Sequence, residues 1–254
     1  MLMRTLVIIP AFNEARSIGK VIGDLPEGVV DEVVVVNNVS TDETELNARA
    51  AGATVLREDR QGYGFACLRG IAYARELEAE GDPPDVIVFL DGDYSDHPDE
   101  LPRLLEPIRS GNADMVIGSR ILGKRNGMVE PRAMLTQALF GNQLACGLIH
   151  FFWGTRFTDL GPFRAIRYGN LLALEMEDET YGWTVEMQIK AARAGLRCTE
   201  VAVSYRRRIG VSKITGTISG TIKASWKILW TITRYAAFPT PSTRKNDVVA
   251  ADRL

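Results

Sequence analysis

Short runs of branched apolar residues alternate with helix-like segments through the first half of this 254-residue chain. Five runs have the length of strands: LVIIP (6–10), EVVVVN (32–37), ATVLRE (53–58), DVIVFLDGD (85–93) and DMVIGS (114–119). The segments between them place apolar residues at helical spacing. Strands joined through helices form right-handed crossovers, so the pattern predicts an α/β protein with a mostly parallel sheet flanked by helices.

The second half is less regular, and we interpret it as an elaboration of the same domain. Its expected elements, in order, are an uncharged helix near 134–154, a strand near 162–166, a helix at 183–195, a strand at 198–206 and an amphipathic helix at 217–238. Neither a repeat nor a linker interrupts the pattern. We therefore expect one domain over residues 1–238, built from halves 1–120 and 121–238, with a polar tail at 239–254.

Charge and cysteine usage narrow the possible functions. The net charge of −2 gives no support to nucleic-acid binding. Three widely spaced cysteines and only two histidines disfavour a disulfide framework, a zinc site or a Ser-His-Asp triad. The first residues lack the features of a secretory signal, so a cytoplasmic setting is expected.

One long stretch, from Arg132 to Arg156, contains no charged residue between these two arginines. It is long enough to cross a bilayer, but several polar residues interrupt it. We therefore favour a buried or lipid-facing helix over a transmembrane span.

Polar clusters follow four of the five predicted strands, as PAFNE, NNVSTD, DGDYSD and GSR. In parallel sheets ligands bind at the carboxyl ends of the strands. A pocket there would contain acceptors for a base or ribose, carboxylates for a hard cation and a guanidinium for phosphate. The side chains expected in it are Asn13, Glu14, Asn37, Asp42, Asp91, Asp93 and Arg120.

The stretch FLDGDYSDHP places Asp91, Asp93 and Asp96 within six positions. Carboxylates this close repel one another unless a cation lies between them. The chain has no Walker-type phosphate loop, so a divalent ion held by Asp91 and Asp93 could neutralise a bound diphosphate. We expect Asp96 to cap the helix that begins near Pro98.

The motifs PAFNEARSI, NNVSTDET, GYGFACLRGI, FLDGDYSDHPDEL, VIGSR and YGWTVEMQIKA occur in this order. Together they resemble family 2 glycosyltransferases with the GT-A (nucleotide-diphospho-sugar transferase) fold over about residues 4–225. The chain is most similar to the dolichyl-phosphate mannosyltransferase and polyprenyl-phosphate glycosyltransferase group. The resemblance implies an Mg²⁺- or Mn²⁺-dependent, inverting transfer of sugar from a UDP- or GDP-sugar, bound by half 1–120, to an acceptor bound by half 121–238.

The resemblance also implies roles for single residues. Pro10, Phe12, Glu14 and Asn37 match positions that contact the nucleobase, and Asp91 with Asp93 matches the metal-binding DxD pair. Arg120 and Arg132 match positions that bind the acceptor phosphate, and Lys213 in the segment YRRRIGVSKI matches a phosphate-binding lysine. The same segment offers Arg207, Arg208 and Ser212, which could instead be exposed residues that protect an edge strand.

Three departures from the family pattern bear on these roles. Asn37-Asn38-Val39 replaces the usual Asp-Asp-Gly, Ser95 replaces a metal-contacting Gln, and DLGPFRAI differs from the usual D-x-x-x-G-F-R. The last change leaves the role of Asp159 open. A phosphate acceptor needs no general base, whereas a sugar or lipid hydroxyl does, and Asp159 and Glu186 are the candidate bases.

Two questions of association stay open at this point. The helix at 217–238 has tryptophans and lysines beside an apolar stripe, which suits either a membrane interface or packing on the core. We expect a peripheral protein at the cytoplasmic face of a membrane, with a homodimer possible. The other functions considered are a non-catalytic nucleotide-sugar-binding protein and nucleotidyl transfer to a sugar phosphate, which normally brings a Gly-rich loop after the first strand.

Overall fold

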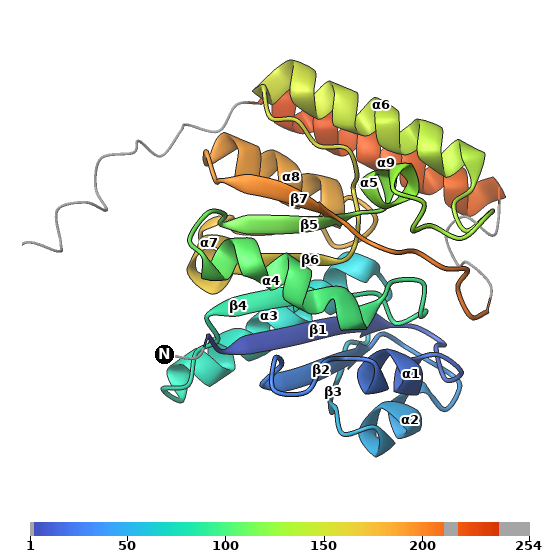
Figure 1. Ribbon diagram of the computed structural model, residues 1–254, viewed down its shortest axis with the longest axis vertical. Helices are drawn as coiled ribbons and strands as arrows, with labels where there is room; N and C mark the ends of the chain where they lie inside the picture. Colours follow the sequence, from blue (N-terminus) through green and yellow to red (C-terminus); the bar gives the residue numbers. More distant parts are fainter. Residues whose placement is uncertain (1–2, 211–217, 239–254) are drawn as a thin grey trace, which may run out of the picture.

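The structure is a computed structural model that describes residues 3–210 and 218–238. In this part of the chain, seven strands form one sheet in the order β3-β2-β1-β4-β6-β5-β7 (Figure 1). The strands are β1 (Thr5–Ala11), β2 (Glu32–Asn37), β3 (Thr54–Arg57), β4 (Val86–Phe89), β5 (Met115–Ser119), β6 (Arg164–Arg167) and β7 (Cys198–Ala202). Only β6 runs antiparallel to its neighbours, so the expectation of a mostly parallel sheet is confirmed.

Helices cover both faces of the sheet. One face carries α1 (Ile18–Gly23), α2 (Thr44–Ala50) and α4 (Leu101–Arg109), which follows the 3₁₀ turn η1 (Pro98–Glu100). The other face carries α3 (Tyr63–Ala79), α6 (Thr136–Trp153), α7 (Tyr168–Ala173), α8 (Trp183–Arg193) and α9 (Ile218–Ala237). The strands between these layers are apolar on both faces, because both faces are buried.

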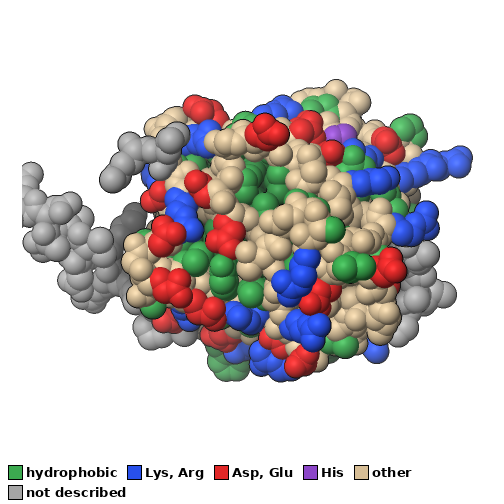
Figure 2. All heavy atoms as spheres, turned by 90° about the horizontal axis from the view of Figure 1, so that it is seen from below, with side chains coloured by type: hydrophobic (Ala, Val, Ile, Leu, Met, Phe, Trp, Pro, Cys, Tyr) green, Lys and Arg blue, Asp and Glu red, His purple; other side chains and the backbone are tan. Residues whose placement is uncertain are grey.

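The two ends of the molecule differ in what they expose. At one end α6 and α9 lie side by side (Figure 1). At the end formed by α2 and β3, acidic and basic side chains are interspersed over the surface (Figure 2). No helix within the described residues combines the length and the apolar character that crossing a bilayer requires.

The order of the strands determines where a ligand can bind. The chain proceeds from β1 to β2 and β3 on one side, and then returns to place β4 on the other side of β1. Loops leave β1 and β4 in opposite directions, so a crevice opens at the carboxyl ends of these two strands. DGD follows β4 at this switch point.

Most predicted elements are present, with three differences. Short helices α5 (Arg120–Arg125) and α7 were not expected from the sequence. The last strand ends at Ala202, so the arginines after it do not protect an edge strand, and that interpretation was wrong. Residues 239–254, the expected polar tail, lie outside the described residues, and the division into halves 1–120 and 121–238 stays a prediction.

Two glycines of the GYG motif allow a loop to approach the start of α3. A Cβ atom at Gly64 would overlap the Asp178 carbonyl oxygen, and one at Gly62 would overlap the Glu179 carbonyl oxygen. The Phe65 amide donates to the Glu179 carbonyl oxygen at 3.0 Å, which holds the loop in place. The motif therefore fixes the position of residues 178–182 against the ends of the strands.

We predict that Gly64→Ala lowers the free energy of unfolding by about 1–3 kcal/mol, because backbone atoms on both sides must separate. Gly19→Ala, in α1, is the matched control, since no atom lies within 4 Å of a Cβ added there. The control should be neutral or stabilising by about 0.5–1 kcal/mol, the usual helix preference for Ala. Urea unfolding of both variants measures this, and equal stability of the two would contradict the close approach.

Candidate active site

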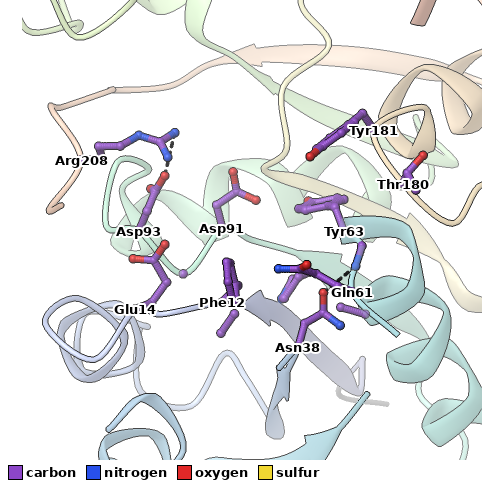
Figure 3. Close-up of a pocket in the computed structure, with 15 residues that line it drawn as sticks. Phe12, Glu14, Asn38, Gln61, Tyr63, Asp91, Asp93, Thr180, Tyr181 and Arg208 are labelled. Carbon is purple, nitrogen blue, oxygen red and sulfur yellow. Dashed lines mark hydrogen bonds and ion pairs between the residues drawn. The ribbon is translucent and has the colours of Figure 1, made fainter. Parts of the chain in front are cut away.

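A cleft of about 350 Å³ lies at the carboxyl ends of β1 and β4 (Figure 3). Phe12 and Glu14 follow β1, and Asp91 and Asp93 follow β4. The loop before α8 adds Tyr181 on the opposite wall. Further lining residues come from the ends of β1 and β2, the start of α3 and the segment after β7: Pro10, Asn38, Gln61, Tyr63, Thr180 and Arg208.

Asp93 is buried, and both of its oxygens are engaged. Oδ1 accepts hydrogen bonds from the Ser95 amide at 2.8 Å and from its hydroxyl at 2.5 Å. Oδ2 forms an ion pair with the Arg208 guanidinium at 2.9 Å. Ser95 therefore supports Asp93 from behind, and Arg208 supplies a positive charge beside it, whereas the divalent ion expected at Asp91 and Asp93 stays a prediction.

Asp91 is in a different state from Asp93. Its Oδ1 atom is buried and has no hydrogen-bond partner within residues 3–210 and 218–238. Burial, with the Asp93 charge adding to it, raises the pKa of Asp91 to about 6. An unpaired carboxylate oxygen directed into a cleft is suited to bind a cation.

The segment after β7 is attached to the DGD loop along its length. The Arg206 amide donates to the Ser95 carbonyl and the Ile209 amide donates to the Asp93 carbonyl, both at 3.0 Å. The Arg206 guanidinium stacks on the Tyr94 ring, 3.4 Å from its centroid. These contacts carry Arg208 to Asp93. Lys213 and Ser212, predicted to bind phosphate, lie outside the described residues.

Asn37 was expected to contact the nucleobase, but of these two neighbouring asparagines it is Asn38 that lines the cleft. Asn37 bonds within its own loop, accepting from the Ser40 amide at 3.0 Å and donating to Glu45 at 3.2 Å, and it does not line the cleft. Asn38 lines the cleft and joins it to the next loop, donating to the carbonyls of residues 58 and 60 and accepting from the Gly62 amide. The sequence motif identified the correct loop, and the geometry favours the second asparagine.

Asn13 and Asp42 likewise stabilise the loops around the cleft. The Asn13 Oδ1 atom accepts from the Thr41 amide at 2.8 Å. The Asp42 carboxylate accepts from the amides of Ala15 at 3.2 Å and Thr44 at 3.0 Å. Neither residue lines the cleft, so the structure gives them a positioning role beside the predicted donor site.

Arg120 and Asp159 form a buried, bidentate ion pair. Nε and Nη2 of Arg120 donate to the two carboxylate oxygens at 2.8 and 2.7 Å, and the Arg120 amide donates to Oδ2 at 2.8 Å. Asp159 is fully buried, and its charge raises the pKa of Arg120. With both oxygens bound to Arg120, Asp159 has the geometry of a residue that orients Arg120, and the base role considered for it is not supported.

Glu186, the second candidate base, lies away from the cleft. Its buried carboxylate accepts from the amides of Glu177 at 3.0 Å and Asp178 at 2.8 Å, and from the Tyr235 hydroxyl at 2.9 Å. Lys190 pairs with it at 2.9 Å. Glu186 therefore joins α8, α9 and the loop before α8, which is a structural task.

A second pocket of about 270 Å³ shares Tyr63, Asp91, Tyr181 and Arg208 with the cleft. Its outer walls are α6 and α9, and Arg120 lies on its inner side. A third hollow of about 460 Å³ adjoins it and is lined by four arginines. These are Arg120, Arg132, Arg207 and Arg208. The arrangement brings the two predicted acceptor arginines together and adds two more.

Asp96 does not cap a helix, so that prediction was wrong. His97 is the residue before the turn η1, and Asp96 is 2% exposed with no hydrogen-bond partner for either carboxylate oxygen within the described residues. Burial, followed by the charge of Asp91, raises its pKa well above the ordinary range. Burial therefore favours the protonated form of Asp96.

The residues present fit a divalent cation bound together with a diphosphate. Among the described residues no group of three or more His, Cys, Asp or Glu side chains could hold a metal ion by itself. Asp91 offers an unpaired oxygen, and Asp93 would offer one once Arg208 moves aside. Two carboxylates with phosphate oxygens and water form the usual coordination of Mg²⁺ at a nucleotide.

Comparison with known proteins identifies the class of protein. The family model described as glycosyl transferase family 2 matches residues 6–165. Undecaprenyl-phosphate mannosyltransferase of Micrococcus luteus is 35% identical over 86% of this chain and 90% of its own length. Dolichyl-phosphate hexose transferase of Haloferax volcanii is 34% identical over 82% and 85%, respectively. The chain belongs to glycosyl transferase family 2 and is a glycosyltransferase, as the sequence motifs predicted.

Solved structures agree on the fold. Glucosyl-3-phosphoglycerate synthase from Mycobacterium tuberculosis, in complex with Mn²⁺, UDP-glucose and phosphoglyceric acid, has a TM-score of 0.70. It is 22% identical, and the match covers 94% of this chain and 81% of that one. The same enzyme in complex with UDP has a TM-score of 0.69. The GT-A fold expected from the motifs is confirmed.

We predict that Asp96→Asn makes stability less dependent on pH. The pKa of Asp96 is raised on folding. The contribution of Asp96 to the stability of the wild type is therefore fully present only below the ordinary carboxyl pKa of about 4, and it is lost as pH rises. The variant is neutral throughout, so its advantage over the wild type should grow from pH 4.5 to 7.5 in urea unfolding. Asp59→Asn, at an exposed carboxylate, is the control. An advantage that stays constant with pH would contradict burial of a neutral acid.

Proposed function

We propose that this enzyme transfers a sugar, with inversion, from a UDP- or GDP-sugar to a polyprenyl (dolichyl-type) phosphate, with Mg²⁺ or Mn²⁺ as cofactor. The observation that carries the proposal is the junction between the two pockets. A cleft suited to a nucleotide ends at Asp91 and Asp93, and opens there into an arginine-lined pocket between two helices. The printed names of the relatives and the Mn²⁺ and UDP-sugar of the solved structures support this assignment.

The donor would lie with its nucleoside along the first wall of the cleft. Pro10 and Phe12 offer an apolar contact for the base, and Glu14 and Asn38 offer polar atoms beside it. Asp91 and Asp93 would hold the divalent ion with the diphosphate. When bound, this ion withdraws charge from the leaving diphosphate as a Lewis acid. Arg208 adds a guanidinium at the same end of the cleft, where negative charge develops.

The acceptor would enter from the other side of the junction. A phosphate monoester is anionic at neutral pH and attacks without a general base. Arg120 and Arg132 would bind its oxygens, with Arg207 and Arg208 nearby. Because Asp159 is bound to Arg120 and Glu186 lies elsewhere, the geometry favours a phosphate over a hydroxyl acceptor. A lipid acceptor places the enzyme at the cytoplasmic face of a membrane; a homodimer stays an untested prediction.

The proposal is tested with a panel of UDP- and GDP-sugars, Mn²⁺ or Mg²⁺, and a short-chain polyprenyl phosphate as acceptor. We expect transfer from one donor, and Asp93→Asn should lower kcat/KM by about 100-fold or more, the usual effect of losing a charge-stabilising group. Asp99→Asn, at an exposed carboxylate of the same loop, should leave kcat/KM unchanged. No transfer from any donor, or full activity of Asp93→Asn, would refute the proposal.

The acceptor site gives a separate prediction. Arg132→Ala should raise the KM for the lipid phosphate by about 10- to 100-fold, the equivalent of one or two charge-assisted hydrogen bonds, and leave the donor Kd unchanged. Glu186→Gln should lower the stability of the loop whose amides it binds, at Glu177 and Asp178, and should not selectively lower kcat. A selective loss of kcat in Glu186→Gln, with donor binding intact, would instead support a general base and a hydroxyl acceptor.

A further inference from the structure

The outer face of α6 is apolar and exposed. Phe140, Leu144, Gly147 and Phe151 follow one another at spacings of four, three and four, and therefore form one stripe along the helix, called here the α6 stripe. Phe140 is 71% exposed and Phe151 78% exposed. Side chains this large are normally covered by something, and a row of them marks a surface for interaction.

Helix α9 extends this surface. It packs beside α6, and Trp226, Trp230 and Phe238 at its outer side are 69%, 53% and 75% exposed. The inner side of α9 is buried, with Ile232 in the main core. One side of this helix therefore packs on the core, and the other side is exposed, as contact with a membrane interface would require.

The segments that contain α6 and α9 carry positive charge, part of which is paired with the loop before α8: Lys227 with Asp178 at 2.9 Å and Arg234 with Glu177 at 3.5 Å. Residues 131–158 and 218–238, which contain α6 and α9, include no Asp or Glu. They include five cations, whereas the whole chain has a net charge of −2. The five are Arg132, Arg156, Lys223, Lys227 and Arg234. The face at the opposite end, seen in Figure 2, mixes both signs.

The second pocket, which Arg120 and Arg208 line, opens between the same pair of helices. Ala138 and Gly141 of α6 and Ala224 and Ile228 of α9 form its outer wall. Phe140 precedes Gly141 and points about 100° away from it around the helix, so the α6 stripe lies beside the face of α6 that lines the pocket. An apolar chain attached to a phosphate in the pocket would leave the protein between these helices.

We propose that the outer faces of α6 and α9 dock on an anionic lipid bilayer, which delivers the acceptor's apolar chain directly into the pocket. The second clause rests on the proposed function, whereas the docking itself does not. Tryptophan with lysine and arginine beside exposed apolar side chains is the composition of a helix that lies in the membrane interface. Arg156 and Lys223 are exposed and add attraction to anionic headgroups.

A second copy of the chain fits this surface less well. A symmetric dimer brings the same patch of each subunit together, so the exposed cations Arg156 and Lys223 of both copies would come close to one another. An anionic bilayer neutralises the same cations. The surface therefore favours a lipid bilayer over a second copy of the chain as its partner.

The docking is tested by sedimentation of the full chain with phosphatidylcholine vesicles, with and without 30 mol% phosphatidylglycerol, a composition on the order of anionic bilayers. We expect the wild type to sediment with the anionic vesicles and less with neutral ones, and high salt to release part of it. The double variant Phe140→Ser/Phe151→Ser should bind at least about tenfold more weakly. Leu46→Ser, at a side chain that is 64% exposed on α2, is the matched control and should bind as the wild type does.

The proposal is overturned if the wild type stays in the supernatant, or if the double variant binds as well as the control. It is also overturned if light scattering finds a dimer that the double variant loses, with no binding to vesicles. Circular dichroism of the variants confirms that a loss of binding is not a loss of fold.

Activity separates this inference from the proposed function. With a short, water-soluble polyprenyl phosphate, the double variant should keep wild-type turnover, since neither phenylalanine lines the cleft or the pockets. With a long acceptor embedded in vesicles, its turnover should fall at least about tenfold, following the loss of binding. Vesicle binding without transfer to either acceptor would refute the proposed function and leave the docking intact. Equal turnover of variant and wild type on embedded acceptor would refute the docking alone.

Discussion

The structure depends on balancing negative charge that is buried at the carboxyl ends of the strands. Asp93, Asp96 and Asp159 are buried, and Asp91 holds one oxygen out of reach of any described partner. Each carboxylate is treated differently: Asp159 is paired with Arg120, Asp93 with Arg208, and burial favours the protonated form of Asp96. Oδ1 of Asp91 has no hydrogen-bond partner among the described residues, and Asp91 shares the charge of Arg208 with Asp93. The arginines therefore do not fully balance the negative charge of the site, and this imbalance favours binding of a cation together with its nucleotide.

The arginines that provide this balance come from distant parts of the chain, and this determines which parts could be foreseen. Strands and long helices are encoded locally, by apolar runs and helical spacing, so the sheet was predictable. The DGD loop was predictable as a site because it follows a buried strand. The pairing of Arg208 with Asp93 was not, because the two residues are far apart in sequence and meet only when the segment after β7 bonds to the loop. Short helices such as α5 depend on tertiary contacts and leave little local signal.

Two predictions differ from the structure for the same physical reason: the sequence does not show in which direction a side chain points. A carboxylate before Pro98 looked like a helix cap, but Asp96 is held by the backbone bonds of its loop and points into the interior. Asn37 and Asn38 are adjacent in an extended segment, where successive side chains point to opposite sides. A motif fixes such positions to within one residue, and the sequence does not tell which of the two faces the ligand. Tyr181 begins the motif YGWTVEMQIKA, but the sequence did not place it or Thr180 in the cleft, because that position depends on close approach at Gly62 and Gly64.

The close approach at Gly62 and Gly64 also positions a loop that lies between the cleft and the second pocket. Asp178 accepts hydrogen bonds from the amides of Thr180 and Gly182 at 2.8 and 3.0 Å, which shapes the loop that carries Tyr181. The other oxygen of Asp178 pairs with Lys227 of α9 at 2.9 Å. Tyr181 lines both the cleft and the pocket between the helices. The loop that carries Tyr181 is thus held by an ion pair to α9. Because the outer face of α9 is exposed, a partner that binds this helix would also restrain the loop. Under the proposed docking, contact of α9 with a bilayer would act on the cleft through the ion pair between Lys227 and Asp178.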